Sequence, residues 1–528
     1  MGISRITGLA REVIMAHLFG AGFSFDAFLL AFRIPNLTRE LFAEGALSSA
    51  FIPSFAATLA ADGEQQAAEV ASLVSSATIL IVGLFCLVGM IFAPQLVHLL
   101  APGFSVVPGK AALAIRLTRI MFPFLLVIAL AAQATGVLNT YNRFGVAAMA
   151  SSFFNVGSVV AGLAIGFWLG PHVGVPAIEG MAYGVVVGGL LQFGWQVPLL
   201  YKYGHRFRFV FNWSHPALRR ILNLMLPALL ANVAVQVNVV VNTSFASRIA
   251  DPLRGHDGPV SWLGYAFRFV HLPLGLFGVA VASAMLPAIS RDAALRNFDE
   301  FRKTFSRCLS MIFLCTAPST VALVLLGKPI IRAVFQSGRF DAYDTSQTAL
   351  ALSCYAVGLL AFAATRVLNP AFYALGDART PMYVSILSIG LNIAIPLVLL
   401  NHFHFGFSSL ALTTSLAVSI ECLLLFEFLR RKLGGIEGDY VLDRFTRIAL
   451  AAVFMAAAIV LLKPLLAPVQ NVDRWTALAQ TAVCLSAGLV TFVIAAAALG
   501  VEELNVVFDA FLFPFKRLVS ASHAKIRV

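Results

Sequence analysis

The sequence predicts an all-α, polytopic membrane protein with about fourteen transmembrane helices. Of its 528 residues, 59% are hydrophobic and only 12% are charged, and the mean hydropathy is +0.88. Apolar runs of roughly 20 residues, the length that crosses a bilayer as a helix, recur along the whole chain. Spanning strands would instead alternate in segments of about 10 residues, and the sequence does not show that alternation.

The first span and the start of the second are unusual, because the stretch Met1–Phe55 is apolar yet rich in ionisable groups. Arginines at positions 5, 11, 33 and 39 stand against carboxylates at positions 26, 40 and 44. Ionisable groups at bilayer depth are costly, so they usually face one another or a water-filled cavity. Counted over these seven groups the stretch is net positive, which predicts a cationic cavity.

The chemistry of arginine indicates which class of ligand this cavity would bind. A guanidinium group is planar and can bond two oxygens of one phosphate at once. The alternative is a set of internal ion pairs that only fix helix packing. An excess of positive charge favours a ligand, because pairing cannot neutralise it. On the residues alone we therefore expect a transporter of an anionic amphiphile.

The following spans are oriented by the basic residues of the loops. With a cytoplasmic N-terminus, the even-numbered connections hold most of the lysines and arginines, as in 202–220 and 430–447, whereas the opposite side holds few. This bias predicts fourteen spans with both termini in the cytoplasm. It also accounts for the net charge of +12, so we expect no nucleic-acid partner.

An internal repeat predicts two lobes of six helices around the central cavity. Ala31-Phe32-Arg33 recurs as Ala266-Phe267-Arg268, and Val137-Leu138-Asn139 recurs as Val367-Leu368-Asn369. Both offsets contain six spans, so the repeats run parallel. We expect an N-lobe at residues 1–205, a C-lobe at 206–435, and two further spans with a cytoplasmic tail at 436–528. Arg268 would then face the cavity from the second lobe.

The sequence contains no hydrolase, P-loop or zinc-protease motif, so we expect no enzyme and no cofactor. The six cysteines lie in apolar runs without metal-ligand spacing. Neutral oxygens of Asn238, Asn392 and Thr413 are weak candidates for a cation site. Hydrogen bonding between helices is the commoner role of such residues.

Several motifs resemble one family of bacterial transporters. They are S-R-I-T-G-L-A-R-E (Ser4–Glu12), F-G-A-G-x-x-x-D-A-F (Phe19–Phe28), P-N-L-x-R-x-L-F-A-E-G-A (Pro35–Ala46), V-L-N-T-x-N-R-F (Val137–Phe144) and W-x-x-Y-A-x-R (Trp262–Arg268). Together they resemble the MurJ (MviN-type) lipid II flippases of cell-wall synthesis, and the resemblance extends over all fourteen spans.

The resemblance implies a fold, a substrate and a location. The fold would be that of the multidrug/oligosaccharidyl-lipid/polysaccharide exporters, working by alternating access in the bacterial inner membrane. The substrate would be lipid II, an undecaprenyl-pyrophosphate-linked disaccharide pentapeptide, and cell-wall synthesis proteins are possible partners. The family's cavity residues correspond to Arg5, Arg11, Asp26, Arg39, Glu44 and Arg268; with Arg33 from the charge pattern, these form the expected substrate-binding set.

Two alternatives to lipid II transport stay open at this point. One is a related flippase for another lipid-linked oligosaccharide, and the other is a cation-coupled drug exporter of the same fold. A cavity for cationic drugs should be acidic and aromatic, so the arginines argue against the exporter. The family's sodium site uses carboxylates where this sequence has asparagines, so we expect dependence on membrane potential more than on sodium.

Overall fold

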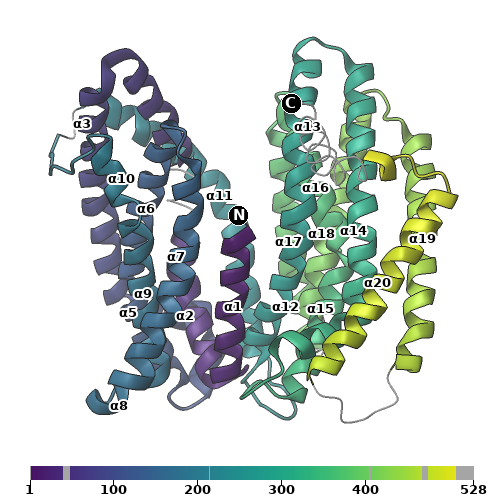
Figure 1. Ribbon diagram of the computed structural model, residues 1–528, viewed down its shortest axis with the longest axis horizontal. Helices are drawn as coiled ribbons and strands as arrows, with labels where there is room; N and C mark the ends of the chain where they lie inside the picture. Colours follow the sequence, from purple (N-terminus) through teal and green to yellow (C-terminus); the bar gives the residue numbers. More distant parts are fainter. Residues whose placement is uncertain (1, 40–47, 213–214, 404–405, 467–473, 507–528) are drawn as a thin grey trace, which may run out of the picture. The chain divides into compact units, whose positions relative to one another are not determined.

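The computed structural model describes residues 2–39, 48–212, 215–403, 406–466 and 474–506. Within these ranges the chain is mostly helical, and an isolated bridge between Asp251 and Gly255 is the only strand-like pairing. The prediction of an all-α membrane protein is confirmed. The helices are long rods joined by short turns (Figure 1).

The chain forms two compact units, each described here by itself. Unit 1 contains residues 1–261 and 335–344, and unit 2 contains residues 262–334 and 345–528. The helices of unit 1 are α1 (Gly2–Phe19), α2 (Phe23–Arg39), α3 (Ser48–Ile91), α4 (Ala93–Leu100), α5 (Lys110–Met121), α6 (Pro123–Thr140), α7 (Phe144–Leu163), α8 (Gly170–Val173), α9 (Ala177–Gly194), α10 (Val197–Lys202) and α11 (Pro216–Arg248). Short 3-10 and π-helical turns, η2 (Pro102–Val106) and η3 (Ala164–Leu169), lie between them.

The helices of unit 2 begin with α12, whose first turn still belongs to unit 1. They are α12 (Pro259–Pro273), α13 (Val279–Ala294), α14 (Phe298–Phe335), α15 (Ala342–Val357), α16 (Leu359–Ala374), α17 (Arg379–Phe403), α18 (Ser408–Lys432), α19 (Gly438–Leu466) and α20 (Arg474–Ala498). A π-helical turn, η4 (Leu274–Gly278), joins α12 to α13.

The helix count agrees with the fourteen expected spans. Ten helices or continuous helix pairs in the described ranges are long and apolar enough to cross a membrane, and the bent pair α15–α16 makes an eleventh. The helices α1, α2 and α11, with 18, 17 and 33 residues, lie where three further spans are expected but are not among those long and apolar enough by this measure. Helix α3 is itself broken at Gly63, which has a φ of 84°.

The boundary between the units differs from the lobe boundary that the repeat predicts near residue 205. By its contacts α11 belongs to unit 1, where Leu218 and Ile221 pack with Phe51, Phe55 and Val74 of α3. In unit 2, α19 and α20 pack against α14 through a core that includes Leu326, Met455 and Phe492. The lobes describe a sequence repeat, and their limits stay a prediction.

Two neighbouring helices of unit 1, α7 and α9, pack backbone against backbone. Gly180, Gly184 and Gly188 recur every four residues on one face of α9. A Cβ atom built on Gly184 would lie 2.4 Å from the carbonyl oxygen of Ser158, and one on Gly188 would lie 2.7 Å from that of Phe154. Small residues permit such close approach of helices in membranes. This contact fixes the α7 segment Ser151–Asn155 against α9.

We expect Gly188→Ala to lower the free energy of unfolding by about 1–3 kcal/mol, because its methyl group would overlap the backbone of α7. Gly194→Ala is the matched control on the same helix, since nothing lies within 4 Å of a Cβ there. Thermal unfolding of both variants in detergent measures the difference. Equal midpoints for the two variants would contradict the close packing of α7 and α9.

Candidate functional site

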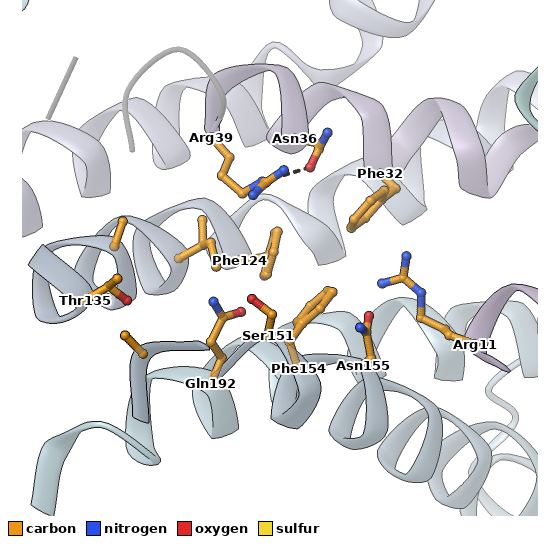
Figure 2. A pocket seen from close by; sticks show the side chains of 13 residues that line it. Arg11, Phe32, Asn36, Arg39, Phe124, Thr135, Ser151, Phe154, Asn155 and Gln192 are labelled. Carbon is orange, nitrogen blue, oxygen red and sulfur yellow. Dashed lines mark hydrogen bonds between the residues drawn. The ribbon is translucent and has the colours of Figure 1, made fainter. Parts of the chain in front are cut away.

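A polar pocket of about 380 Å³ opens between five helices of unit 1. Its volume falls in the range of small-molecule sites. Figure 2 shows arginines and amides converging on it across three phenylalanine rings. The lining residues come from α1, α2, α6, α7 and α9, and they are Arg11, Phe32, Asn36, Arg39, Phe124, Ile128, Ala132, Thr135, Ala147, Ser151, Phe154, Asn155 and Gln192.

Arg11 enters the pocket from α1 and is held from two sides. Its guanidinium donates to the Glu12 carboxylate at 3.0 Å. The guanidinium carbon also lies 5.6 Å from the ring centre of Phe32 and 5.3 Å from that of Phe154. Cation–π contacts strengthen where water is excluded, and the Arg11 side chain is only 15% exposed. These contacts therefore orient the guanidinium before any ligand arrives.

Arg39 enters the same pocket from the last turn of α2. Its Nε donates to the amide oxygen of Asn36 at 2.9 Å (Figure 2). An amide oxygen orients a guanidinium without cancelling its charge. Arg39 therefore brings a positive charge to the pocket, and its fork suits an anionic oxygen pair.

The wall opposite α2 is built from neutral polar groups. Asn155 of α7 lines the pocket, and its amide nitrogen donates to the Ser4 carbonyl at 3.1 Å and the Thr7 hydroxyl at 3.2 Å. Thr135 of α6 donates to Gln196 at 2.9 Å. Gln196 in turn donates to the carbonyl oxygens of Ala131 and Gln192. These bonds tie α1 to α7 and α6 to α9.

The charge of the stretch Met1–Phe55 needs one correction. Glu12 also lies in this stretch and was left out of the count that made it net positive. With Glu12 included, the stretch has four arginines and four carboxylates, so it carries no net excess. The positive character is instead a property of the pocket, because its described lining includes two arginines and no carboxylate.

The other predicted site residues fall in different places. Arg33 bonds the hydroxyl of Thr243 and thereby links α2 to α11. Arg5 lies exposed on α1, six residues before Arg11, and is not part of the pocket lining. Arg268 lies half-buried on α12 in unit 2. Glu44 lies outside the described residues. The substrate roles of all four stay predictions.

Asp26 lies in a buried ion-pair network that is separate from the pocket. Both Asp26 and Lys110 are fully buried, and Lys110 Nζ lies 2.8 Å from the Asp26 carboxylate. The same carboxylate accepts the backbone N–H groups of Gly258 and Ser261, each at 2.9 Å. Asp26 therefore caps the first turn of α12, where a negative charge is favourable.

Lys110 has three further partners at this position. Its ammonium donates to Asp257 at 2.7 Å and to the carbonyl oxygen of His256 at 2.9 Å. It also lies 4.5 Å from the ring centre of Phe104. A buried charge is tolerated when it is paired and fully hydrogen-bonded. This network ties α2 and α5 to the loop that precedes α12.

The cation-site candidates make ordinary hydrogen bonds between and within helices. Asn238 accepts from Asn242 at 3.2 Å within α11. Asn392 of α17 accepts from Thr414 of α18 at 3.3 Å, and Thr413 bonds the backbone of its own helix. Asn238 belongs to unit 1, and the other two belong to unit 2. Cation binding at these residues stays a prediction.

Comparison with known proteins identifies the family. The family model described as "Lipid II flippase MurJ" matches residues 15–471. The chain belongs to the MurJ family. It is therefore a transporter rather than an enzyme, as the sequence predicted, and a multi-pass membrane protein.

Curated members of the MurJ family cover most of this chain. The "Lipid II flippase MurJ" of Burkholderia cenocepacia is 34% identical over 439 residues, which is 81% of this chain and 82% of that protein. The "Probable lipid II flippase MurJ" of Vibrio cholerae is 33% identical over 464 residues, covering 87% and 85% of the two chains.

Solved structures agree with this assignment. The structure described as "Lipid II flippase MurJ, inward closed conformation" matches with a TM-score of 0.75 and 26% identity over 97% of this chain and 98% of that one. An inward-facing multidrug MATE transporter matches with a TM-score of 0.69 at 16% identity, over 82% of this chain and 94% of the other. The second match shows the shared fold alone.

Sequence reasoning missed the amide and hydroxyl residues that line the pocket. Asn36, Asn155, Gln192 and Ser151 lie in apolar helices, where such residues usually hydrogen-bond to neighbouring helices. Asn36 offered one signal, since it stands three residues before Arg39 and therefore on the same helical face. The other three offered none that distinguishes a pocket wall from a helix contact.

We expect Lys110→Met to lower the free energy of unfolding by about 3–5 kcal/mol, because it leaves the buried Asp26 carboxylate without its counter-charge. The double variant Lys110→Met with Asp26→Asn should recover part of this loss. Asp341→Asn is the control, since it breaks an exposed pair with Arg254 and should cost at most about 1 kcal/mol. Thermal unfolding of the four proteins measures the effect, and a fully stable Lys110→Met variant would contradict the network.

Proposed function

We propose that this protein moves lipid II from the inner to the outer leaflet of the bacterial cytoplasmic membrane. The single observation that carries this proposal is the convergence of Arg11 and Arg39, from separate helices, on one pocket with no carboxylate in its described lining. The printed names of the family relatives support lipid II as the substrate.

In this proposal the pyrophosphate of the substrate is held by the two guanidinium groups. Each can donate two parallel hydrogen bonds to phosphate oxygens, and such charge-assisted bonds are about twice as strong as neutral ones. Arg5 and Arg268 complete the set in the predicted scheme. The pocket's amides and hydroxyls offer both donors and acceptors, which suits the hydroxyl and amide groups of the sugar and peptide.

Movement follows from alternating access between two states of the protein. A polar head group crosses the membrane without meeting lipid only if the cavity opens to one side at a time. Binding of the dianionic pyrophosphate reduces the repulsion between the arginines. The substrate therefore favours the state in which the arginines approach one another. Release requires that state to open on the other side.

We expect Arg11→Ala and Arg39→Ala each to abolish transport while the folded protein is retained, because each removes one of the two guanidinium groups of the pocket that would hold the pyrophosphate. Lysine at either position should restore only part of the activity, since it supplies charge without the bidentate fork. The measurement is the accessibility of lipid II to an external label, in cells whose own flippase has been depleted.

The matched control for these variants is Arg248→Ala, which removes an equal charge from an exposed position at the end of α11. It should transport like the parent protein. Full transport by both Arg11→Ala and Arg39→Ala would contradict the proposed site. A parent protein that leaves lipid II inaccessible, yet exposes another lipid-linked oligosaccharide, would identify a different substrate.

We expect transport to respond to membrane potential more than to a sodium gradient. Moving one elementary charge through the membrane field corresponds to about 2.3 kcal/mol per 100 mV, enough to bias two states that differ by a few kcal/mol. The measurement is flipping in proteoliposomes with potential and sodium gradient set separately. Transport that follows sodium at zero potential would overturn this expectation and direct mutation to Asn238 and Asn392.

A further inference from the structure

A second cavity of unit 1, about 310 Å³ in volume, lies on the other face of α6 from the polar pocket. Helix α6 presents Ile128, Ala132 and Thr135 to the polar pocket. It presents Leu130, Gln133, Ala134 and Val137 to the second cavity. The remaining walls come from α3, α9, α10 and the segment after α10, and most of their side chains are apolar.

One wall of the second cavity holds an unsatisfied polar atom. His205 lines the cavity and is only 9% exposed. Its Nε2 lies 3.1 Å from the hydroxyl of Tyr141, whereas its buried Nδ1 has no hydrogen-bond partner among the described residues. A buried polar atom without a partner is costly and rare in folded proteins. Nδ1 is therefore available to a ligand.

The ring of His205 is held between aromatic side chains. It packs against Phe55 and Tyr141, with ring centres 5.6 and 5.5 Å away. Burial lowers the pKa of His205, and the carboxylate of Glu64 opposes this shift only partly. A neutral imidazole has one donor and one acceptor nitrogen. When the Tyr141 hydroxyl donates to Nε2, Nδ1 carries the proton and is the donor without a partner among the described residues.

The segment after His205 alternates cationic and aromatic side chains. Arg206, Phe207, Arg208, Phe209 and Phe211 are all exposed. The segment is attached to α3 through a 3.0 Å bond from the Val210 N–H to the Ser76 hydroxyl. Aromatic rings favour the level of the lipid headgroups, and arginines there attract anionic lipid. Arg206 and Phe207 also border the cavity itself.

We propose that this cavity binds an anionic diacyl phospholipid of the leaflet that the loop charges predict to be cytoplasmic. One acyl chain lies between α3 and α6, an ester carbonyl accepts the hydrogen bond of His205 Nδ1, and the phosphate meets Arg206. The apolar walls, the imidazole of His205 and the cationic rim match the acyl chain, the ester and the phosphate of such a lipid in order. The site is separate from the polar pocket, so it does not depend on the function proposed above.

The test uses the purified full-length chain in lipid nanodiscs. Phosphatidylglycerol with a photoactivatable group on one acyl chain is the probe, and phosphatidylcholine with the same group is the comparison. We expect crosslinks on α3 and α6 that are several-fold more abundant with phosphatidylglycerol. Arg206→Gln should reduce this labelling about fivefold, the effect of one basic residue at an anionic surface.

Matched variants separate the cavity from general surface charge. Arg208→Gln removes the same charge two residues away, outside the cavity lining, and should retain most of the labelling. His205→Phe keeps an aromatic ring but removes the Nδ1 donor, and should also reduce labelling. Arg206 is exposed, so its replacement tests the proposal even where the His205 variant folds poorly.

Three results would overturn the proposal. Equal labelling by the two lipids would show that only ordinary surrounding lipid reaches the cavity. Undiminished labelling of both Arg206→Gln and His205→Phe would remove the assigned contacts. Displacement of the probe by a polyprenyl pyrophosphate, but not by unlabelled phosphatidylglycerol, would assign the cavity to the tail of the transported substrate instead.

Discussion

A cation enclosed by apolar helices needs nearby groups that stabilise its charge. Unit 1 provides such groups in three different ways. Lys110 is neutralised by the carboxylates of Asp26 and Asp257. Arg11 is shared between Glu12 and two aromatic rings. Arg39 is oriented by the neutral amide of Asn36. The groups that contact these cations thus range from carboxylates to aromatic rings and a neutral amide.

This division has an energetic basis. Lys110 makes hydrogen bonds to two carboxylates and a carbonyl oxygen, so an incoming anion would have to displace strong, charged partners. An anion that approaches Arg39 meets a guanidinium whose bond to Asn36 is to a neutral group, and such bonds are weaker than charge-assisted ones. This difference is consistent with placing the proposed phosphate site at the pocket and not at Lys110.

The sequence predicts the helices of this fold well because hydropathy and loop charge act along the chain. It also identifies Arg11 and Arg39, since charged side chains in apolar helices stand out. It could not assign Asp26 to an ion pair, because its partner Lys110 is 84 residues away in sequence and a lysine at the start of a helix, here α5, gives no sign of its partner. The sequence could not predict that Asn155 and Gln192 line the pocket, for a different reason. An amide that lines a pocket and an amide that joins two helices give the same sequence pattern.

The glycine contact between α7 and α9 has a consequence for the polar pocket. Because backbone meets backbone at Gly184 and Gly188, the two helices have little room to shift against each other, and we expect them to move as one rigid pair. Asn155 and Gln192 belong to this helix pair, whereas Arg11 and Arg39 project from α1 and α2. A change in the width of the pocket then requires α1 or α2 to move relative to α7 and α9. The guanidinium groups would then move with α1 or α2, and the amides suited to the sugar and peptide would stay in place on α7 and α9.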